Sequence, residues 1–157
     1  MEKGSHCVHT PLHPLRTFAS SMSALKTFLV EDSPVIQQSL VATLEELTPV
    51  QVVGMAEDEW HATQWLSQPA NAVGLVIVDI FLKRGSGLGV LKAAQHLGPH
   101  CSLVVLSNYA TKDIRSKCLA LGARRVFDKS TEIDALIQYC SELAEGTNPT
   151  GPVPLGE

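Results

Sequence analysis

Apolar residues along this chain form two kinds of pattern that alternate with each other. Five short, mainly apolar runs occupy residues 27–30, 50–55, 75–78, 102–106 and 125–127. The run over residues 75–78 shows no polar alternation, which is typical of a strand buried on both faces of a parallel sheet. Apolar residues at helical spacing follow these runs, over residues 34–47, 58–67, 88–97, 111–121 and 133–143. The pattern therefore predicts five strands alternating with five helices.

Capping residues support the predicted helices. Asp32 or Ser33 with Pro34 fits the cap and first turn of the first helix, and Ser130 or Thr131 is expected to cap the last. Strands and helices in strict alternation predict an α/β fold, a doubly wound five-stranded parallel sheet with helices on both faces. This fold leaves no room for a second domain.

The length of 157 residues suits one domain with tails. We expect the domain over residues 25–145. Residues 1–24 lack apolar periodicity, and residues 146–157 are rich in proline and glycine, so both are expected to be flexible tails. Residues 1–21 precede a second methionine, Met22, and are a candidate upstream extension that the fold does not use.

Composition excludes several classes of partner. The net charge is −4 and there is no basic run, which argues against nucleic acid. No apolar stretch has the length of a membrane span, so no membrane partner and a cytoplasmic location are expected. The four cysteines, Cys7, Cys101, Cys118 and Cys140, form no CxxC pair, which favours reduced thiols. Three of them lie in apolar segments and are expected to be small core residues.

Chemically competent side chains follow four of the predicted strands. Glu31 and Asp32 follow the first, Asp79 the third, Ser107 the fourth and Lys129 the fifth. The carboxyl ends of parallel strands meet at one rim, where ligands bind. Three carboxylates at close range repel one another unless they share a cation, and an oxygen-only set suits Mg²⁺. The lysine and hydroxyl would then face an anion such as a phosphoryl group, with Asp79 as its nucleophile. The simpler alternative is that Asp79 only caps a turn.

This ordered set, together with Gly87 eight residues after Asp79, resembles the receiver domains of two-component response regulators over about residues 26–145. The resemblance implies a flavodoxin-like strand order, 2-1-3-4-5. It also implies transfer of a phosphoryl group to Asp79 from a histidine kinase or a histidine phosphotransfer protein. In this family Mg²⁺ would bind Asp32, Asp79 and the backbone carbonyl of Phe81.

The same resemblance gives roles to the remaining rim residues. Glu31 would help to hold the metal through water, Ser107 would contact the phosphoryl oxygen and Lys129 would neutralise it. Such a protein is not an enzyme in the usual sense, since it catalyses only its own phosphorylation and dephosphorylation. Its output would be phosphorylation-dependent binding of an unknown target, or onward transfer of the phosphoryl group by a stand-alone receiver.

Three positions depart from the family pattern. Val126 stands where many receivers carry an aromatic switch residue, with Phe127 expected to point the other way. Ser130 follows Lys129 where a cis proline is usual, which leaves the geometry of that bond open. Lys83 stands where many receivers have proline.

Other functions compete with this one. A receiver-shaped module that binds partners without phosphorylation remains the main alternative. A haloacid-dehalogenase phosphatase would need an aspartate at Phe81, and a flavin carrier would need a less acidic first loop than residues 31–34. The glycines of residues 85–89 do not match a dinucleotide loop, because its third glycine would fall on Val90.

Two partner-binding surfaces and the lifetime of the phosphorylated state are also predicted. The first helix near Val35, Gln38 and Ser39 is expected to contact the kinase, and the fourth helix with Arg124 and Arg125 a downstream target. Bulky Phe81 and Tyr109 are expected to flank the path of the hydrolytic water and to give a long-lived phosphorylated state.

Overall fold

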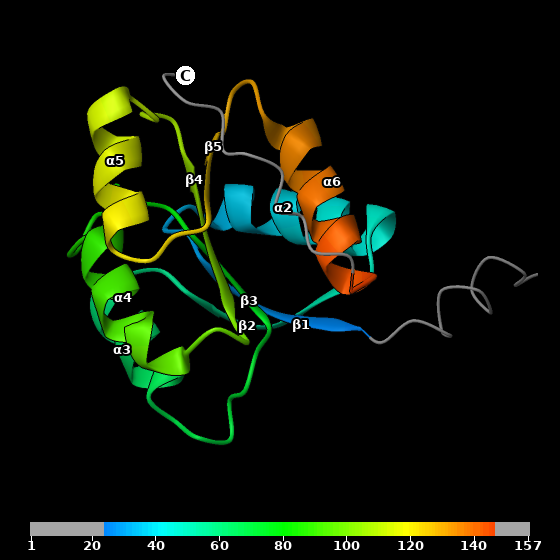
Figure 1. The fold of residues 1–157 in the computed structure, drawn as a ribbon, viewed down its shortest axis with the longest axis horizontal. Helices are drawn as coiled ribbons and strands as arrows, with labels where there is room; N and C mark the ends of the chain where they lie inside the picture. Colours follow the sequence, from blue (N-terminus) through cyan, green and yellow to red (C-terminus); the bar gives the residue numbers. More distant parts are fainter. Residues whose placement is uncertain (1–23, 147–157) are drawn as a thin grey trace, which may run out of the picture.

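The computed structural model describes residues 24–146, and its elements carry the labels of Figure 1. In chain order they are β1 (Leu25–Val30), α2 (Pro34–Leu47), β2 (Val50–Ala56), α3 (Glu59–Leu66), β3 (Leu75–Val78), α4 (Gly87–Ala94), the 3₁₀ turn η2 (Gln95–Leu97), β4 (Ser102–Ser107), α5 (Lys112–Ala120), β5 (Arg125–Asp128) and α6 (Ile133–Ala144). The predicted alternation of five strands and five helices is confirmed. The expected tails fall almost wholly outside the described residues.

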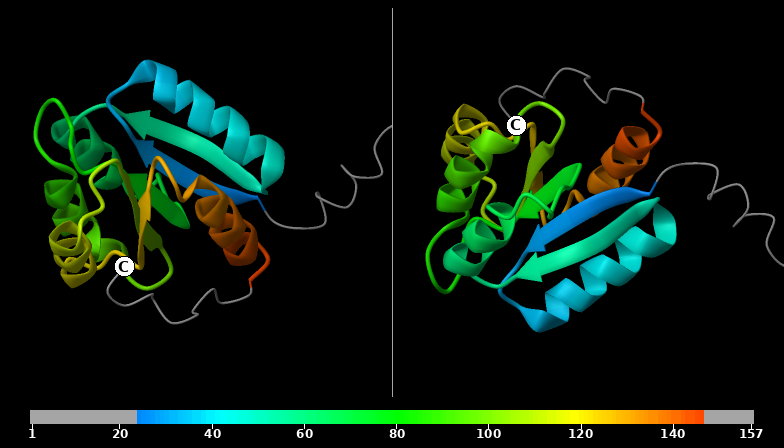
Figure 2. Two further views of the ribbon diagram at one scale, coloured as in Figure 1. Left: turned by 90° about the horizontal axis from the view of Figure 1, so that it is seen from above. Right: turned by 90° about the horizontal axis from the view of Figure 1, so that it is seen from below.

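The five strands form one parallel sheet in the order β2-β1-β3-β4-β5. Helices α3, α4 and α5 cover one face of the sheet, and α2 and α6 cover the other, as Figures 1 and 2 show. The predicted doubly wound fold and its 2-1-3-4-5 order are therefore confirmed. Because all five strands run the same way, their carboxyl ends lie at one edge of the sheet.

The core consists of two apolar layers, one on each face of the sheet. Strand β3 contributes to both: Val76 and Val78 pack under α3, α4 and α5, whereas Leu75 and Ile77 pack under α2 and α6. All four side chains are fully or almost fully buried. Burial on both faces explains why this strand shows no polar alternation.

The cysteines of the described residues belong to this core. Burial raises the pKa of Cys101 and Cys118 to about 11 and that of Cys140 to about 12. Such thiols stay protonated at neutral pH and behave as small apolar side chains, as predicted. Cys7 lies outside the described residues.

Side-chain caps begin four of the helices. Ser33 accepts a hydrogen bond from the backbone N–H of Ile36, and Pro34 fills the first turn of α2, as predicted. The expected cap of the last helix was wrong. Glu132 occupies that cap position without a side-chain cap bond. Ser130 instead donates its hydroxyl and its backbone N–H to the Asp128 carboxylate, so it closes a turn before the helix begins.

No helix among residues 24–146 is long and apolar enough to cross a membrane.

Candidate functional site

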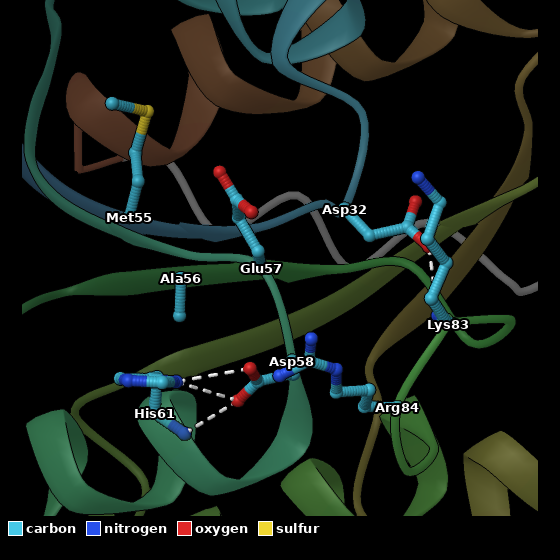
Figure 3. A pocket seen from close by; sticks show the side chains of 8 residues that line it. All are labelled: Asp32, Met55, Ala56, Glu57, Asp58, His61, Lys83 and Arg84. Atoms are coloured by element: carbon cyan, nitrogen blue, oxygen red, sulfur yellow. Dashed lines mark hydrogen bonds and ion pairs between the residues drawn. The ribbon is translucent and has the colours of Figure 1, made fainter.

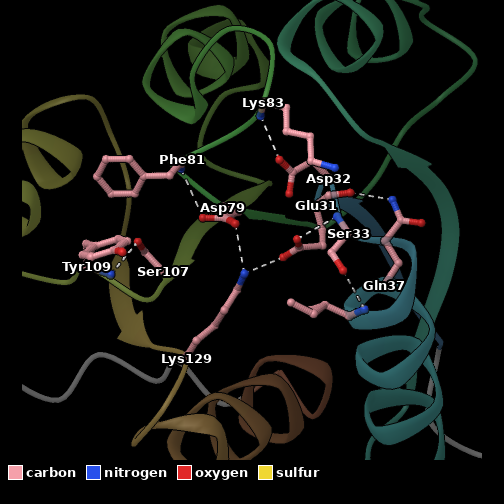
Figure 4. Close-up of polar contacts among 11 residues, drawn as sticks. Glu31, Asp32, Ser33, Gln37, Asp79, Phe81, Lys83, Ser107, Tyr109 and Lys129 are labelled. Atoms are coloured by element: carbon pink, nitrogen blue, oxygen red, sulfur yellow. Dashed lines mark hydrogen bonds and ion pairs between the residues drawn. The ribbon is translucent and has the colours of Figure 1, made fainter.

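The side chains expected at the strand ends come together at the carboxyl edge of the sheet. Figure 4 shows Asp79 at the centre, with Glu31 and Asp32 on one side and Ser107 on the other. Lys129 enters from below and points between Glu31 and Asp79. The topology brings these residues together because β1, β3, β4 and β5 are consecutive neighbours in the sheet.

Three carboxylates form a compact cluster. One oxygen from each of Glu31, Asp32 and Asp79 lies within 4.8 Å of the other two. Glu31 is 2% exposed and Asp79 8% exposed, so water screens their charges poorly. Burial raises the pKa of Glu31, although its hydrogen bond with Lys129 acts in the opposite direction. A cation is therefore needed here for all three groups to be ionised together.

Lys129 supplies one such positive charge. Its Nζ lies 2.6 Å from Glu31 Oε1 and 2.9 Å from Asp79 Oδ2. Burial works to lower the pKa of Lys129, but hydrogen bonds with these two carboxylates outweigh it and the net shift is upward. The ammonium therefore stays charged at neutral pH and links the ends of β1, β3 and β5.

Backbone N–H groups fix the orientation of each carboxylate. Ser33 N–H donates to Glu31 Oε2 at 3.0 Å, and Lys83 N–H donates to Asp32 Oδ2 at 2.8 Å. Phe81 N–H donates to Asp79 Oδ1 at 3.2 Å, so Asp79 does close a turn, as the simpler alternative held. The same carboxylate also binds Lys129, which a turn cap alone does not explain.

Gln37 is a buried polar residue at this site that sequence reasoning missed. Its side-chain amide donates to the backbone carbonyl of Glu31 at 2.6 Å. The bond holds the first turn of α2 against the end of β1, which steadies the acidic loop. A polar residue beside the apolar stripe of the helix was the available signal, and it did not distinguish a buried amide from an exposed one.

The loop after Asp79 turns tightly back on itself. Phe81 forms an isolated antiparallel bridge with Ser86, and Gly87 N–H donates to the Ile80 carbonyl at 2.9 Å. A Cβ at Gly87 would lie 2.7 Å from the Ile80 Cα and even closer to the Asp79 carbonyl. Glycine is required here by close backbone approach, in line with its expected place eight residues after Asp79.

The hydroxyl side of the site is built from the end of β4. Ser107 is the last residue of that strand, fully buried, and its Oγ accepts a hydrogen bond from Tyr109 N–H at 3.1 Å. The rings of Phe81 and Tyr109 meet edge to face, with centroids 5.1 Å apart. They are 49% and 62% exposed and lie on the same side of Asp79 (Figure 4). An aromatic pair thus stands beside Asp79.

The positions that depart from the family pattern have clear placements. Val126 packs in the layer under α3, α4 and α5, and Phe127 packs in the opposite layer. The two side chains therefore point to opposite faces of the sheet, as expected. The described residues contain no cis peptide bond, so Lys129 and Ser130 are joined in trans. Lys83 is exposed, and it uses its backbone N–H on Asp32 where a proline would have none.

A neighbouring pocket shares Asp32 and Lys83 with the site and extends toward α3 (Figure 3). Its most organised pair is Asp58 and His61, where His61 Nδ1 lies 2.9 Å from both carboxylate oxygens. Hydrogen bonding from the His61 backbone and ring lowers the pKa of Asp58. The pocket lining is mixed in charge, because it combines the acids Asp32, Glu57 and Asp58 with the cations Lys83 and Arg84.

Residues 27–141 match the family model described as the response regulator receiver domain. The chain belongs to this family.

The receiver fold is also found in solved structures. One is the signal receiver domain of the response regulator NarL from Mycobacterium tuberculosis, with a TM-score of 0.69, 19% identity and coverage of 79% of this chain and 98% of the other. Another is the isolated receiver domain of RcsB from Salmonella enterica serovar Typhimurium, in the presence of the phosphomimetic BeF₃⁻. Its TM-score is 0.69, at 23% identity and coverage of 83% and 95%.

Curated relatives of this receiver domain are longer proteins. A protein-glutamate methylesterase/protein-glutamine glutaminase of Azospirillum brasilense is 27% identical over 121 residues, which is 76% of this chain and 30% of that protein. A protein of the same name from Hydrogenovibrio crunogenus is 32% identical over 104 residues, 65% of this chain and 27% of that protein. The receiver chain thus spans less than a third of the length of these relatives.

The two surfaces expected to bind partners lie at different distances from the site. Val35, Gln38 and Ser39 are exposed on the first turns of α2, next to Glu31 and Asp32. Arg124 and Arg125 are not in a helix, because α5 ends before them and Arg125 begins β5. They therefore lie at the opposite edge of the receiver from the acidic cluster. Arg124 donates to the Pro99 carbonyl, and Arg125 lies over the Tyr139 ring.

Proposed function

We propose that this receiver domain accepts a phosphoryl group on Asp79 from a phosphohistidine of a histidine kinase or a histidine phosphotransfer protein. The observation that carries the proposal is the buried carboxylate cluster bridged by Lys129, with a hydroxyl on the adjacent strand. In the reaction the P–N bond of the donor breaks, a P–O bond forms to Asp79, and the imidazole nitrogen leaves with the bonding electron pair.

Asp79 is the carboxylate placed to be the acceptor. Strand β3 lies between β1, which carries the other two acids, and β4, which carries Ser107. A carboxylate at the end of β3 therefore lies between the acids of β1 and the hydroxyl of β4. Glu31 is held by Ser33 N–H and Lys129 and is almost fully buried, which suits a supporting role.

The donor set fits Mg²⁺. Three carboxylates with oxygens within 4.8 Å of one another match a cation that takes oxygen ligands and keeps several waters. Asp32, Asp79 and the Phe81 carbonyl would hold it, and Glu31 would assist through water. Bound Mg²⁺ neutralises the cluster and the incoming phosphoryl oxygens.

Ser107 and Lys129 act on the transferred group from the other side. The Ser107 hydroxyl accepts from Tyr109 N–H, which leaves its own proton to donate to a phosphoryl oxygen. Lys129 already lies 2.9 Å from Asp79 and can neutralise the new charge with a small movement. Both residues would therefore contact the phosphoryl group only in the phosphorylated form. This difference in contacts would favour a second conformation that a partner can recognise.

We further propose that the phosphorylated receiver signals by binding a protein partner or by passing the phosphoryl group on. The exposed start of α2 adjoins the site and is the surface proposed for the phosphodonor. Buried reduced thiols at Cys101, Cys118 and Cys140 agree with a cytoplasmic setting for this exchange. The methylesterase and glutaminase names belong to relatives of which the receiver covers less than a third, and they are not transferred.

The test is phosphorylation by acetyl phosphate, followed by intact mass. The parent with Mg²⁺ should gain one phosphoryl group, and Asp79→Asn should gain none. Asp58→Asn, which removes a carboxylate from the neighbouring pocket, is the matched control and should be phosphorylated like the parent. A parent that gains no mass would favour the module that binds without phosphorylation, and a gain that persists in excess chelator would remove the metal from the mechanism.

A further inference from the structure

Glu59, the first residue of α3, contacts the loop that follows Asp79. Its backbone N–H donates to the Arg84 carbonyl at 3.2 Å, and its Oε1 accepts from Ser86 N–H at 2.9 Å. Residues 57–59 form an acidic run at the start of this helix. Glu57 is exposed to solvent, but Glu59 is half-buried and bonds to a segment 27 residues away.

Two glycines make the space that the Glu59 side chain fills. A Cβ at Gly85 or at Gly89 would lie 2.7 Å from Glu59 Oε1, and other Glu59 atoms would be closer still. Gly85 also has a φ of +79°, a conformation that glycine adopts without strain. The Glu59 side chain thus accounts for both Gly85 and Gly89, which do not form a dinucleotide loop.

The loop that Glu59 holds is the one that presents backbone groups to the acidic cluster. Ser86 donates its backbone N–H to Glu59 and forms a β-bridge with Phe81. The N–H of Phe81 orients Asp79, and its carbonyl is a proposed metal ligand. Between them, Lys83 N–H orients Asp32. Glu59 therefore acts on the cluster through Ser86 and Phe81, without touching it.

We propose that Glu59 is a positioning residue that sets the affinity of the receiver for Mg²⁺ by holding residues 81–86 in their ligating conformation. The inference rests on the metal site of the proposed function. The physical reason is preorganisation, because a loop already fixed loses less conformational entropy when its carbonyl binds a cation. The contact is suited to this role, since a carboxylate acceptor makes a stronger hydrogen bond to an N–H than a neutral oxygen does.

The first experiment needs no metal. Hydrogen exchange of residues 81–86 is measured in chelator for the parent, Glu59→Ala, Glu59→Gln and Glu57→Ala. Exchange should be faster in Glu59→Ala. In Glu59→Gln it should lie between the parent and Glu59→Ala, since the amide oxygen still accepts from Ser86 N–H but carries no charge. Glu57→Ala is the matched control and should not change. Unchanged exchange in Glu59→Ala would overturn the proposal.

The second experiment is a calorimetric Mg²⁺ titration of the same proteins, with the rate of phosphorylation by acetyl phosphate followed over Mg²⁺ concentration. Glu59→Ala should bind Mg²⁺ about tenfold more weakly, the lower end of what outer-sphere partners contribute. Its rate at saturating Mg²⁺ should equal that of the parent. A lower saturating rate with unchanged affinity would contradict a positioning role through the metal.

A double-mutant cycle isolates the Glu59 contact. Gly89→Ala should weaken Mg²⁺ binding in the parent, because the added methyl displaces the Glu59 carboxylate. In the Glu59→Ala background the same change should have no further effect. Additive losses would show that Gly89 acts independently of Glu59 and would overturn that part of the account. If the parent itself binds no Mg²⁺, the proposed function fails as well, whereas tight binding by every variant defeats only the role of Glu59.

Discussion

The two sides of the receiver site are held by different means. On the carboxylate side, backbone N–H groups of Ser33, Phe81 and Lys83 fix all three acids. On the hydroxyl side, Ser107 has one such bond, from Tyr109 N–H, and its loop is joined to the rest by an arginine. Main-chain donors thus hold the acids of the first side, whereas the loop after Ser107 on the second side is held in part by a side chain from α5.

That arginine is Arg115. Its Nε donates to the Ala110 carbonyl at 3.0 Å, and its Nη1 donates to the Val126 carbonyl at 2.8 Å. Its Nη2 lies 3.0 Å from Glu132, which also accepts from Asp128 N–H. One guanidinium thus connects the loop after Ser107 with the strand and turn that carry Lys129. This link adds to the backbone hydrogen bond that Lys129 N–H donates to the Ser107 carbonyl at 2.9 Å.

Lys129 belongs to both sides, and its removal should have the largest effect. Lys129→Ala leaves Glu31 and Asp79 without their cation, and unpairing a buried ion pair costs about 3 kcal/mol. Thermal or urea unfolding in chelator measures the loss. Lys83→Ala, on the same edge but exposed, should change stability by less than about 0.5 kcal/mol. A Lys129→Ala protein as stable as this control would contradict the buried pairing.

The loss in Lys129→Ala should depend on pH. Burial raises the pKa of Glu31 above 4.5, and Lys129 opposes that rise. Without the lysine the folded state holds the Glu31 proton to higher pH than the unfolded state does. Stability should therefore fall as the pH rises from 4.5 through the raised folded pKa, more steeply in the variant than in the parent. Parallel pH profiles would show that Lys129 does not control this carboxyl.

Arg115→Lys should loosen the hydroxyl side of the site and leave the carboxylate side unchanged. The free energy of unfolding should fall by roughly 1 to 2 kcal/mol, because lysine cannot keep three directed bonds. Hydrogen exchange should become faster in residues 108–111 and 129–132, and Mg²⁺ affinity should stay unchanged. Glu59→Ala should instead weaken Mg²⁺ binding and leave hydrogen exchange in residues 108–111 and 129–132 unchanged. Lys117→Ala, an exposed position on the same helix, is the control. Loss of Mg²⁺ affinity in Arg115→Lys would mean that the two sides are one cooperative unit.

The sequence predicted the edge of the sheet at which the site lies and the order of its residues, because both follow from buried strands that end in polar groups. It also indicated the opposite directions of Val126 and Phe127, which strand periodicity dictates. Gln37, Glu59 and Arg115 were missed. Each bonds to backbone groups of another segment, and such contacts depend on how loops approach one another in space. The false cap at Ser130 has the same origin, since Asp128 competes for its hydroxyl.

The aromatic pair across the two sides should control the lifetime of the phosphorylated state. Phe81 and Tyr109 are in edge-to-face contact beside Asp79, and the Phe81 ring carries no group that could orient a water. Phe81→Asn with Tyr109→Glu should open the approach and speed loss of the phosphoryl group several-fold, since a tenfold change needs about 1.4 kcal/mol in the barrier. Decay is followed after removal of the donor. Equal or slower decay would show that these rings do not shield the bond.

The smallest effect is expected outside both sides. Residues 1–21 offer no apolar face in the sequence, and we propose that the receiver domain spans residues 25–145. Deleting residues 1–21 should leave the free energy of unfolding within about 0.5 kcal/mol of the parent and leave phosphorylation unchanged. Calorimetry and the acetyl phosphate assay measure both. A clear loss in either would place part of that segment within the working receiver.

The central claim is that Asp79 receives the phosphoryl group. Borohydride reduces an aspartyl phosphate to homoserine, so the modified position can be read by peptide mass mapping after treatment with acetyl phosphate and Mg²⁺. The account predicts homoserine at position 79 in the parent and at no position in Asp79→Asn. Homoserine at position 32, or a phosphoryl group on a histidine that borohydride does not reduce, would contradict it.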